Sequence, residues 1–195
     1  MSALLYIVRH GQTDWNAEQR LQGQAEVDLN EVGRTQIERN AKLLASLIST
    51  PSDFDFVSSP LRRTRATMER IRLEFGLPAE GYATDVRLME LHFGDWQGHT
   101  YAELEQLRPG STLERHEQKW TFVPPGAQAE SYQMLADRVA EWLADVRQPT
   151  ICTTHGGVIR VLFHLIGKMP TGDAVNMPVP QDLVLRVTGG RLEWL

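Results

Sequence analysis

Two short apolar runs near opposite ends of the chain each end at a histidine–glycine pair. Residues 3–8 are followed by Arg9-His10-Gly11, and residues 149–154 are followed by His155-Gly156-Gly157. An apolar, β-branched run that stops at a glycine is typical of a buried strand. In open α/β sheets, ligands bind beside the carboxyl ends of the strands. We therefore expect two imidazoles and an arginine to meet in space, although about 145 positions separate the histidines.

Helical patterns alternate with these and other strand patterns. Further strands are expected over residues 54–58 and 83–88, helices over 31–49, 60–75, 131–146 and 157–166, and a terminal hairpin over 183–187 and 191–195. Asn30 is expected to cap the first helix, and Ser59-Pro60 to start the second. The alternation predicts an α/β fold, a three-layer α/β/α sandwich. Because the hairpin is antiparallel, the sheet is expected to be mixed but mostly parallel.

The chain length predicts a single domain over residues 1–195. Residues 90–132 depart from the alternation, with short helical pieces between glycines and a Pro124-Pro125-Gly126 break. We interpret this stretch as a small helical and loop insert, or cap, over the carboxyl ends of the strands.

The net charge of −5 argues against nucleic acid or an anionic membrane as a partner, so any anion site must be a local basic cluster. The single cysteine, Cys152, allows no disulfide within the chain and fits a core position better than a reactive thiol. No segment has the pattern of a signal peptide or a membrane span, which predicts a cytoplasmic protein. The sequence does not decide between a monomer and a homodimer.

Three of the four expected strand ends are followed by a group that can be cationic. The first strand is followed by Arg9 and His10, the second by Arg62-Arg63, the third by Glu90 and the fourth by His155. Arginine presents a planar fork of donors that matches phosphate oxygens, and nearby glycines let backbone N–H groups approach an anion. The strand ends therefore predict a pocket for a phosphoryl group in a small-molecule phosphate ester.

These residues are part of a longer ordered pattern spread over roughly the first 165 residues. It comprises residues 5–16 (with Arg9-His10-Gly11-Gln12-Thr13), Arg20-Leu21-Gln22-Gly23, residues 28–33, Ser59-Pro60-Leu61-Arg62-Arg63, residues 88–98 around Glu90, and Thr154-His155-Gly156-Gly157. The pattern resembles the histidine phosphatase superfamily, which includes the cofactor-dependent phosphoglycerate mutases.

The resemblance implies a role for each matching position. His10 would be the nucleophile that becomes phosphohistidine, and Glu90 would be the proton donor. The phosphoryl oxygens would be held by Arg9, Arg63 and His155, with further substrate-binding groups at Asn16, Gln22, Gly23 and Gly156. Arg63 fits the family spacing better than Arg62, which is expected to face solvent.

Elementary electrostatics agrees with these roles. An imidazole attacks phosphorus only when it is neutral, and the charges of Arg9 and Arg63 are expected to lower the pKa of His10. The same charges would stabilise the transferring phosphoryl group. Because these cations are supplied by side chains, we expect neither a metal site nor a cofactor, and activity that survives a strong chelator.

Three functions remain open at this stage. The preferred one is a metal-independent phosphomonoesterase, and the alternatives are a phosphoglycerate mutase-type phosphotransferase and an inactive phosphate-binding module. Residues 90–132 contain seven acidic and three basic residues, which disfavours a mutase because its substrate carries a second anion. The aromatic residues of the insert would pack it onto the sheet or form an apolar wall beside the leaving group. The phosphatase branch suggests α-ribazole phosphate as one candidate substrate, beside sugar and glycerate phosphates.

Overall fold

The computed structural model describes residues 3–195, which form a six-stranded sheet in the order β3-β2-β4-β1-β5-β6. The strands are β1 (Leu5–Arg9), β2 (Asp55–Ser58), β3 (Ala83–Thr84), β4 (Thr150–Thr154), β5 (Val184–Thr188) and β6 (Arg191–Trp194). The four strands β1 to β4 pair with one another in parallel. β5 pairs antiparallel with both β1 and β6. The predicted mixed, mostly parallel sheet is thus confirmed.

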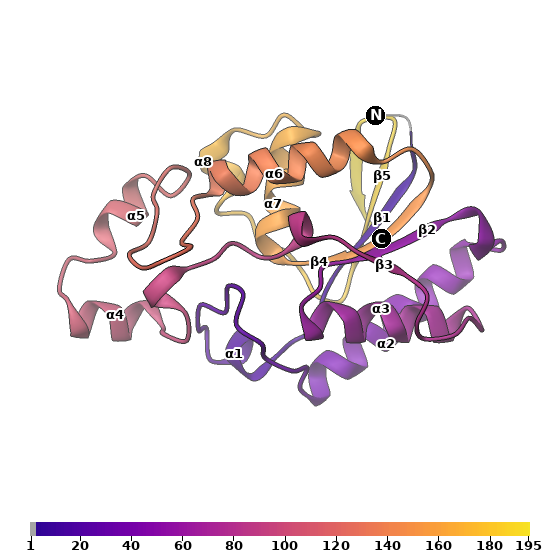
Figure 1. Cartoon of the computed structure of the whole chain (residues 1–195), viewed down its shortest axis with the longest axis horizontal. Helices are drawn as coiled ribbons and strands as arrows, with labels where there is room; N and C mark the ends of the chain where they lie inside the picture. The colour runs from indigo at the N-terminus through magenta and orange to yellow at the C-terminus, as the bar shows by residue number, and fades with distance from the viewer. Residues whose placement is uncertain (1–2) are drawn as a thin grey trace.

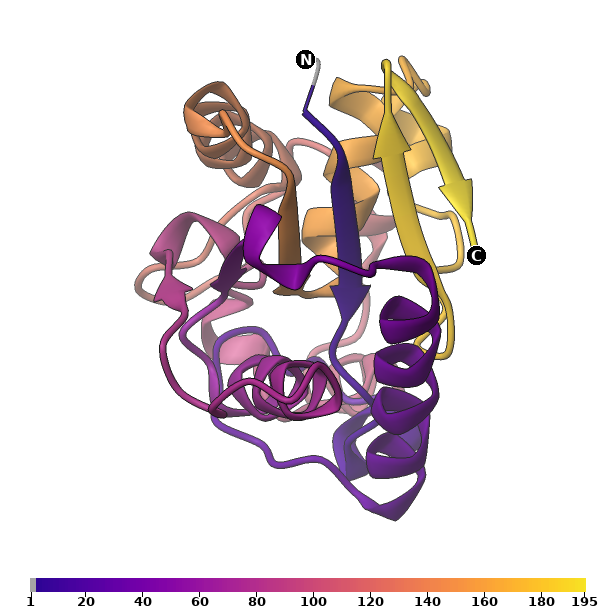
Figure 2. The ribbon, with the colours of Figure 1, turned by 90° about the vertical axis from the view of Figure 1, so that its right-hand side faces the viewer.

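Helices cover both faces of the sheet (Figures 1 and 2). One face carries α2 (Glu31–Leu47) and α3 (Arg62–Glu74), and the other carries α6 (Tyr132–Asp145) and α7 (Gly156–Leu165). The alternation of side chains along β1 explains the two layers, because successive residues of a strand point to opposite faces. Leu5 and Ile7 join the apolar cluster of α6 and α7, and Tyr6 and Val8 join that of α2 and α3.

The remaining elements are short. They are α1 (Asp14–Ala17), α4 (Tyr101–Leu107), α5 (Leu113–Glu117), α8 (Thr171–Ala174) and the 3₁₀ turns η1 (Pro51–Asp53), η2 (Val86–Leu88) and η3 (Gly94–Trp96). α4 and α5 extend to one side of the sheet (Figure 1). Their segment is anchored by aromatic packing, with Trp96 and Phe122 rings 5.3 Å apart and Trp120 stacked on Tyr132. The aromatic residues therefore serve the packing role that was one of the two expected for them.

Two predicted boundaries are wrong. α3 begins at Arg62 rather than after Ser59, and the Ser59 hydroxyl is hydrogen bonded to His155 instead of capping the helix. The strand expected over residues 83–88 stops after two residues, because the Asp85 side chain accepts the Arg87 N–H and starts the turn η2. In the described part of the chain, no helix is long and apolar enough to cross a bilayer.

Candidate active site

The register between β1 and β4 places the two histidine–glycine pairs side by side. Arg9 pairs with Thr154 in this parallel ladder, and the His10 N–H donates to the Thr154 carbonyl at 3.0 Å. The next residue on each strand is a histidine, and the imidazole centroids lie 5.1 Å apart. The chain thus brings His10 and His155 together through the pairing of its two central strands.

The hydrogen bonds of His10 fix its tautomer. Nδ1 lies 2.8 Å from the Gly11 carbonyl, which can only accept, so Nδ1 carries the ring proton. Nε2 accepts a hydrogen bond of 3.3 Å from Nε of Arg63. The lone pair of Nε2 is therefore aimed at a guanidinium, where an incoming anion would also be drawn.

The imidazole of His10 is buried and flanked by cations. Its pKa lies well below the usual value, because burial disfavours the charged ring and the charges of Arg63 and Arg9 oppose it. The direction agrees with the sequence prediction, although burial, which the sequence did not reveal, contributes more than the arginines. His10 is consequently neutral near pH 7, as a nucleophile requires.

Arg63 is almost completely buried in the first turn of α3. Its Nη1 and Nη2 donate to the carbonyls of Ala25 and Gly23, each at 2.7 Å, and these bonds aim Nε at His10. Gly23 has φ +52°, and a Cβ there would lie 2.2 Å from the Gln97 side-chain oxygen, so the loop needs glycine at this position. Arg62 faces solvent, as expected, beside Glu26.

Arg9 is the last residue of β1, at the carboxyl end of the strand and on the face of the sheet that α7 covers. Nη1 donates to the Val179 carbonyl at 2.5 Å, while Nε is buried without any partner in residues 3–195. Burial lowers the pKa of Arg9 to about 10, which still leaves it charged at neutral pH. Gly156 is a direct neighbour of this guanidinium, because a Cβ there would lie 3.5 Å from it, an ordinary contact distance. An unsatisfied buried cation is costly, and an anion at this point would relieve the cost.

His155 is fully buried beside His10. Its Nε2 is 2.8 Å from the Ser59 hydroxyl, and its Nδ1 has no partner in the described chain. Burial and the charge of Arg63 hold the pKa of His155 well below its usual value. The ring is thus a neutral hydrogen-bonding group, and the contact with Ser59 is one that the sequence reading missed.

Glu90 meets the site at the N-terminus of α7. Its two carboxylate oxygens accept the Gly157 N–H at 3.0 and 3.1 Å, and Oε1 also accepts the Leu91 N–H at 2.9 Å. The first N–H groups of a helix have no partner within it, so that of Gly157 is available to orient the Glu90 carboxyl group. A Cβ on Gly157 would lie 2.1 Å from Oε1, so the second glycine of the motif makes room for the carboxyl.

Arg138 of α6 fixes the backbone that carries Glu90. Its guanidinium donates to the carbonyls of Met89 and Glu90 at 2.8 and 3.1 Å and forms an ion pair with Glu130 at 2.9 Å. Gln24 adds a further bond to the Glu90 carbonyl at 3.0 Å. The sequence reading missed these positioning residues, because an arginine on an amphipathic helix looks like an ordinary surface residue.

Asn16 and Gln22 lie on the loop after β1. The Asn16 oxygen accepts the Thr13 N–H and a bond from Gln181, which leaves its Nδ2 group to donate elsewhere. Gln22 donates to the Thr13 hydroxyl at 2.7 Å, and its own oxygen is buried without a partner among residues 3–195. Hydrogen bonds with Thr13 therefore hold both amide side chains in place, and within residues 3–195 neither amide is hydrogen bonded to a histidine ring.

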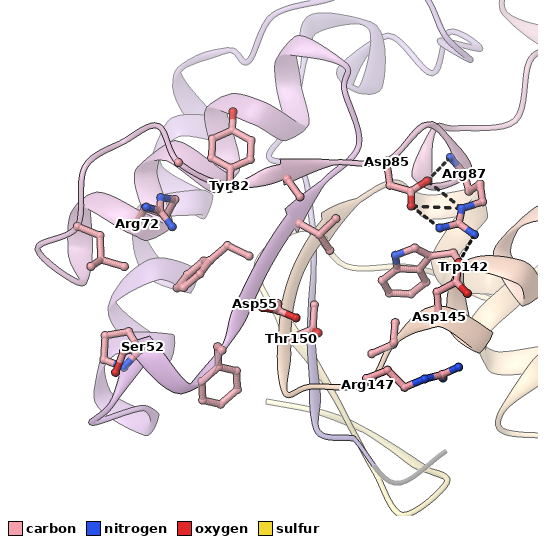
Figure 3. Close-up of a pocket in the computed structure, with 18 residues that line it drawn as sticks. Ser52, Asp55, Arg72, Tyr82, Asp85, Arg87, Trp142, Asp145, Arg147 and Thr150 are labelled. Carbon is pink, nitrogen blue, oxygen red and sulfur yellow. Dashed lines mark hydrogen bonds and ion pairs between the residues drawn. The ribbon is translucent and has the colours of Figure 1, made fainter.

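A large cavity of the described chain lies away from these residues. It has a volume of about 820 Å³ and is lined by Asp55 and Thr150, at the starts of β2 and β4 (Figure 3). Ligands of open α/β sheets bind at the opposite, carboxyl ends of the strands, where the histidines are. No group of three or more potential metal-ligating side chains was found within residues 3–195.

The comparisons with known proteins agree with this arrangement. Residues 5–193 match the histidine phosphatase superfamily (branch 1). Glucosyl-3-phosphoglycerate phosphatase of Mycobacterium tuberculosis is 35% identical over 180 residues, which cover 87% of this chain and 77% of the relative. A metal-independent phosphoserine phosphatase of Arabidopsis thaliana is 32% identical over 164 residues, 82% of this chain and 66% of that protein.

A solved structure shows the same fold. The mycobacterial glucosyl-3-phosphoglycerate phosphatase complexed with VO3 superimposes with a TM-score of 0.78 and 31% identity, covering 100% of this chain and 96% of that one. The predicted fold class is therefore confirmed, and so is the resemblance from which the site residues were inferred. The chain belongs to the histidine phosphatase superfamily, branch 1.

Proposed function

We propose that the protein is a metal-independent phosphomonoesterase in which His10 is the covalent nucleophile and Glu90 the proton carrier. The observation that carries this proposal is the state of His10, a buried neutral imidazole whose Nε2 lone pair faces the guanidinium of Arg63. Nucleophile and electrostatic stabiliser are therefore in place before substrate binds. The phosphatase relatives support this reading over a mutase or an inactive binding module.

In the first step, Nε2 of His10 attacks the phosphorus atom and the ester P–O bond breaks. The leaving alkoxide takes the proton of the Glu90 carboxylic acid. Arg9, Arg63 and the unpartnered Nδ1 of His155 hold the phosphoryl oxygens, and the Gly156 N–H and the Asn16 amide add donors. The products of this step are the free alcohol and a phosphohistidine on His10.

In the second step, the Glu90 carboxylate takes a proton from water and the water oxygen attacks phosphorus. The P–N bond breaks, inorganic phosphate leaves, and His10 returns to its neutral form. The positive charge that the ring carries in the phosphohistidine is released with this bond. The cycle needs no metal ion because arginines supply the positive charge.

The test is steady hydrolysis of an aryl phosphate in the presence of a strong chelator. We expect phosphate release by the wild-type protein and none by His10→Ala, because the variant has no nucleophile. A rapid alkaline quench during turnover should preserve phosphate on the protein, and later acidification should release it. Activity retained in His10→Ala, or activity that the chelator abolishes and magnesium restores, would overturn the proposal.

The mutase alternative is decided in the same assay series. Isomerisation of a glycerate phosphate faster than its hydrolysis would indicate phosphotransfer, and a protein that binds phosphate without turnover would indicate a binding module. α-Ribazole phosphate, sugar phosphates and glycerate phosphates remain candidate substrates for this screen.

A further inference from the structure

Three neighbouring strands of the sheet end at one row of polar side chains. β2, β4 and β1 lie side by side in this order, and the residues that follow them are Ser59, His155 and His10. The His155 ring is therefore flanked on both sides, with the His10 ring centroid 5.1 Å away and the Ser59 hydroxyl 2.8 Å from its Nε2. All three side chains are buried. Ser59 takes no part in the proposed phosphoryl transfer itself.

The backbone of Ser59 is fixed at the end of β2. Its N–H donates to the Thr153 carbonyl at 3.0 Å and so continues the ladder between β2 and β4. Its carbonyl accepts the hydroxyls of Ser58 and Thr64 at 2.7 and 2.9 Å. These bonds hold the Ser59 side chain against His155, so that only the direction of its hydroxyl proton is left to be assigned.

The hydroxyl proton of Ser59 has one acceptor. Within residues 3–195, Oγ forms hydrogen bonds with two groups, the Leu61 N–H at 3.5 Å and Nε2 of His155 at 2.8 Å. The Leu61 N–H can only donate, so Nε2 is the group that can accept the hydroxyl proton. A buried hydroxyl that donates to nothing costs free energy, and the proton is therefore expected on the line from Oγ to Nε2.

This bond assigns the tautomer of His155. The lowered pKa of His155 means that the ring carries a single proton at neutral pH, with one N–H donor and one lone pair. If Nε2 accepts from Ser59, the ring proton is on Nδ1, and both the hydroxyl and Nε2 have their partners. In the other tautomer Nε2–H would point at Oγ, and the Ser59 proton would have no acceptor.

Nδ1 is the nitrogen of His155 that remains for a phosphoryl oxygen, because it has no partner in the described chain. Protonated Nδ1 donates a hydrogen bond to such an oxygen. Unprotonated Nδ1 would instead turn its lone pair toward the negative charge of the oxygen and repel it. The hydroxyl of Ser59, which does not touch the phosphoryl group, thereby determines whether His155 attracts or repels that group.

We propose that Ser59 is a positioning residue, whose hydroxyl donates to Nε2 of His155 and keeps the ring proton on Nδ1, the atom that binds the phosphoryl group. The inference rests on the proposed phosphomonoesterase function and adds the group that orients one of its phosphoryl donors. The Gly11 carbonyl does the same for His10, where a proton on Nδ1 leaves Nε2 free to attack. Both rings thus carry the proton on Nδ1, one to expose a lone pair and the other to expose a donor.

Nitrogen-15 NMR of the imidazole rings tests this assignment without turnover. Long-range proton–nitrogen correlation spectra show which ring nitrogen carries the proton, and the variants His10→Ala and His155→Asn assign the signals. Above neutral pH, we expect the wild-type protein to carry the proton on Nδ1 of both rings. Ser59→Ala should move part of the His155 proton to Nε2 and leave His10 unchanged, whereas Ser59→Thr, which keeps the hydroxyl, should restore Nδ1. A wild-type His155 protonated on Nε2, or an unchanged ring in Ser59→Ala, would overturn the inference.

Phosphate binding and hydrolysis provide a second measurement. Ser59→Ala should weaken the binding of inorganic phosphate and lower kcat/KM by about tenfold, the usual order for one hydrogen bond to a charged group. The loss in kcat/KM should be equal for an alkyl and an aryl ester, because His155 faces the phosphoryl group and not the leaving group. A loss confined to the alkyl ester would contradict the inference, because it would place the effect on the proton donor.

Ser58→Ala is the matched control. Ser58 is an equally buried hydroxyl one residue earlier, and it is hydrogen bonded to the Ser59 carbonyl and the Thr153 hydroxyl. The variant should lower the free energy of unfolding but leave the His155 proton on Nδ1. An equal shift of the proton in both variants would mean that a loosened end of β2, and not the Ser59 hydroxyl, controls the ring. A wild-type protein that does not hydrolyse the aryl phosphate would overturn the proposed function and leave the NMR assignment intact, so the two failures are distinguishable.

Discussion

The proposed phosphoryl site and the segment of α5 both carry buried cations, but they are built differently. Arg9, His10 and His155 stand at the ends of two paired central strands, and Arg63 is held by two backbone carbonyls. Arg115 and Lys119 stand on and just after a five-residue helix that rests on aromatic packing. The strands of the central sheet fix the position of the side chains at their ends. A short surface helix constrains its side chains less, so that one residue can more easily replace another there. We infer that the first region tolerates substitution less than the second.

The largest test of this contrast is on Glu90. Glu90→Gln keeps the shape of the side chain but cannot deliver a proton, so we expect kcat to fall by about 10²–10⁴-fold for an alkyl ester. The loss should be smaller for an aryl phosphate, whose leaving group needs less protonation. Stopped-flow and steady-state assays on both esters measure it. Equal losses on the two esters would show that Glu90 is not the proton donor.

The neighbouring arginines provide a test of fixed position. Arg63→Met removes the donor that faces His10 and should lower kcat/KM by about 10²–10³-fold, as the loss of one preorganised donor does. Arg62→Met removes the same charge one residue away, where the side chain is exposed, and should change kcat/KM less than about twofold. Similar losses in both variants would mean that general charge, rather than placement at His10, supplies the stabilisation.

The smallest expected effect concerns stability against pH. His10 and His155 have folded-state pKa values below the unfolded value of 6.5, so below that pH the unfolded chain binds protons that the folded chain excludes. The free energy of unfolding should therefore fall from pH 7 to pH 5, by at most about 1.4 kcal/mol per pH unit for each histidine. Urea denaturation of His155→Asn should show a shallower fall than the wild-type protein, whereas the exposed His116→Asn should follow the wild-type slope.

Much of the phosphoryl site could be predicted from the sequence because its residues follow strands directly. The parallel register needs only that the two apolar runs be neighbours, and Arg9, His10 and His155 then meet. Arg63 lies in the first turn of α3, and the predicted start of this helix was wrong by two residues. An error of that size still leaves Arg63 next to the carboxyl ends of the strands. Sequence signals at strand ends thus tolerate small errors in element boundaries.

The positive charge near α5 could not be predicted in the same way. Arg115, Lys119 and Arg160 come from two segments that meet only through tertiary packing, and their composition suggests the opposite charge. Ser59 and Arg138 were missed for a related reason, because each acts through a contact far along the chain that no local pattern encodes. Periodicity reports which side of an element is buried, but not which residue lies across from it.

The pairing of β1 with β4 also has a consequence for synthesis. The proposed nucleophile, His10, precedes its neighbour His155 by about 145 positions. The Val179 carbonyl, which accepts a bond from Arg9, and Gln181, which donates to the His10 carbonyl, follow later still. A growing chain on the ribosome therefore carries His10 without the surroundings that keep it neutral and buried until residues 155–181 have been made. The proposed catalytic centre forms only after Gln181 has emerged, so that the appearance of activity would report completion of this fold.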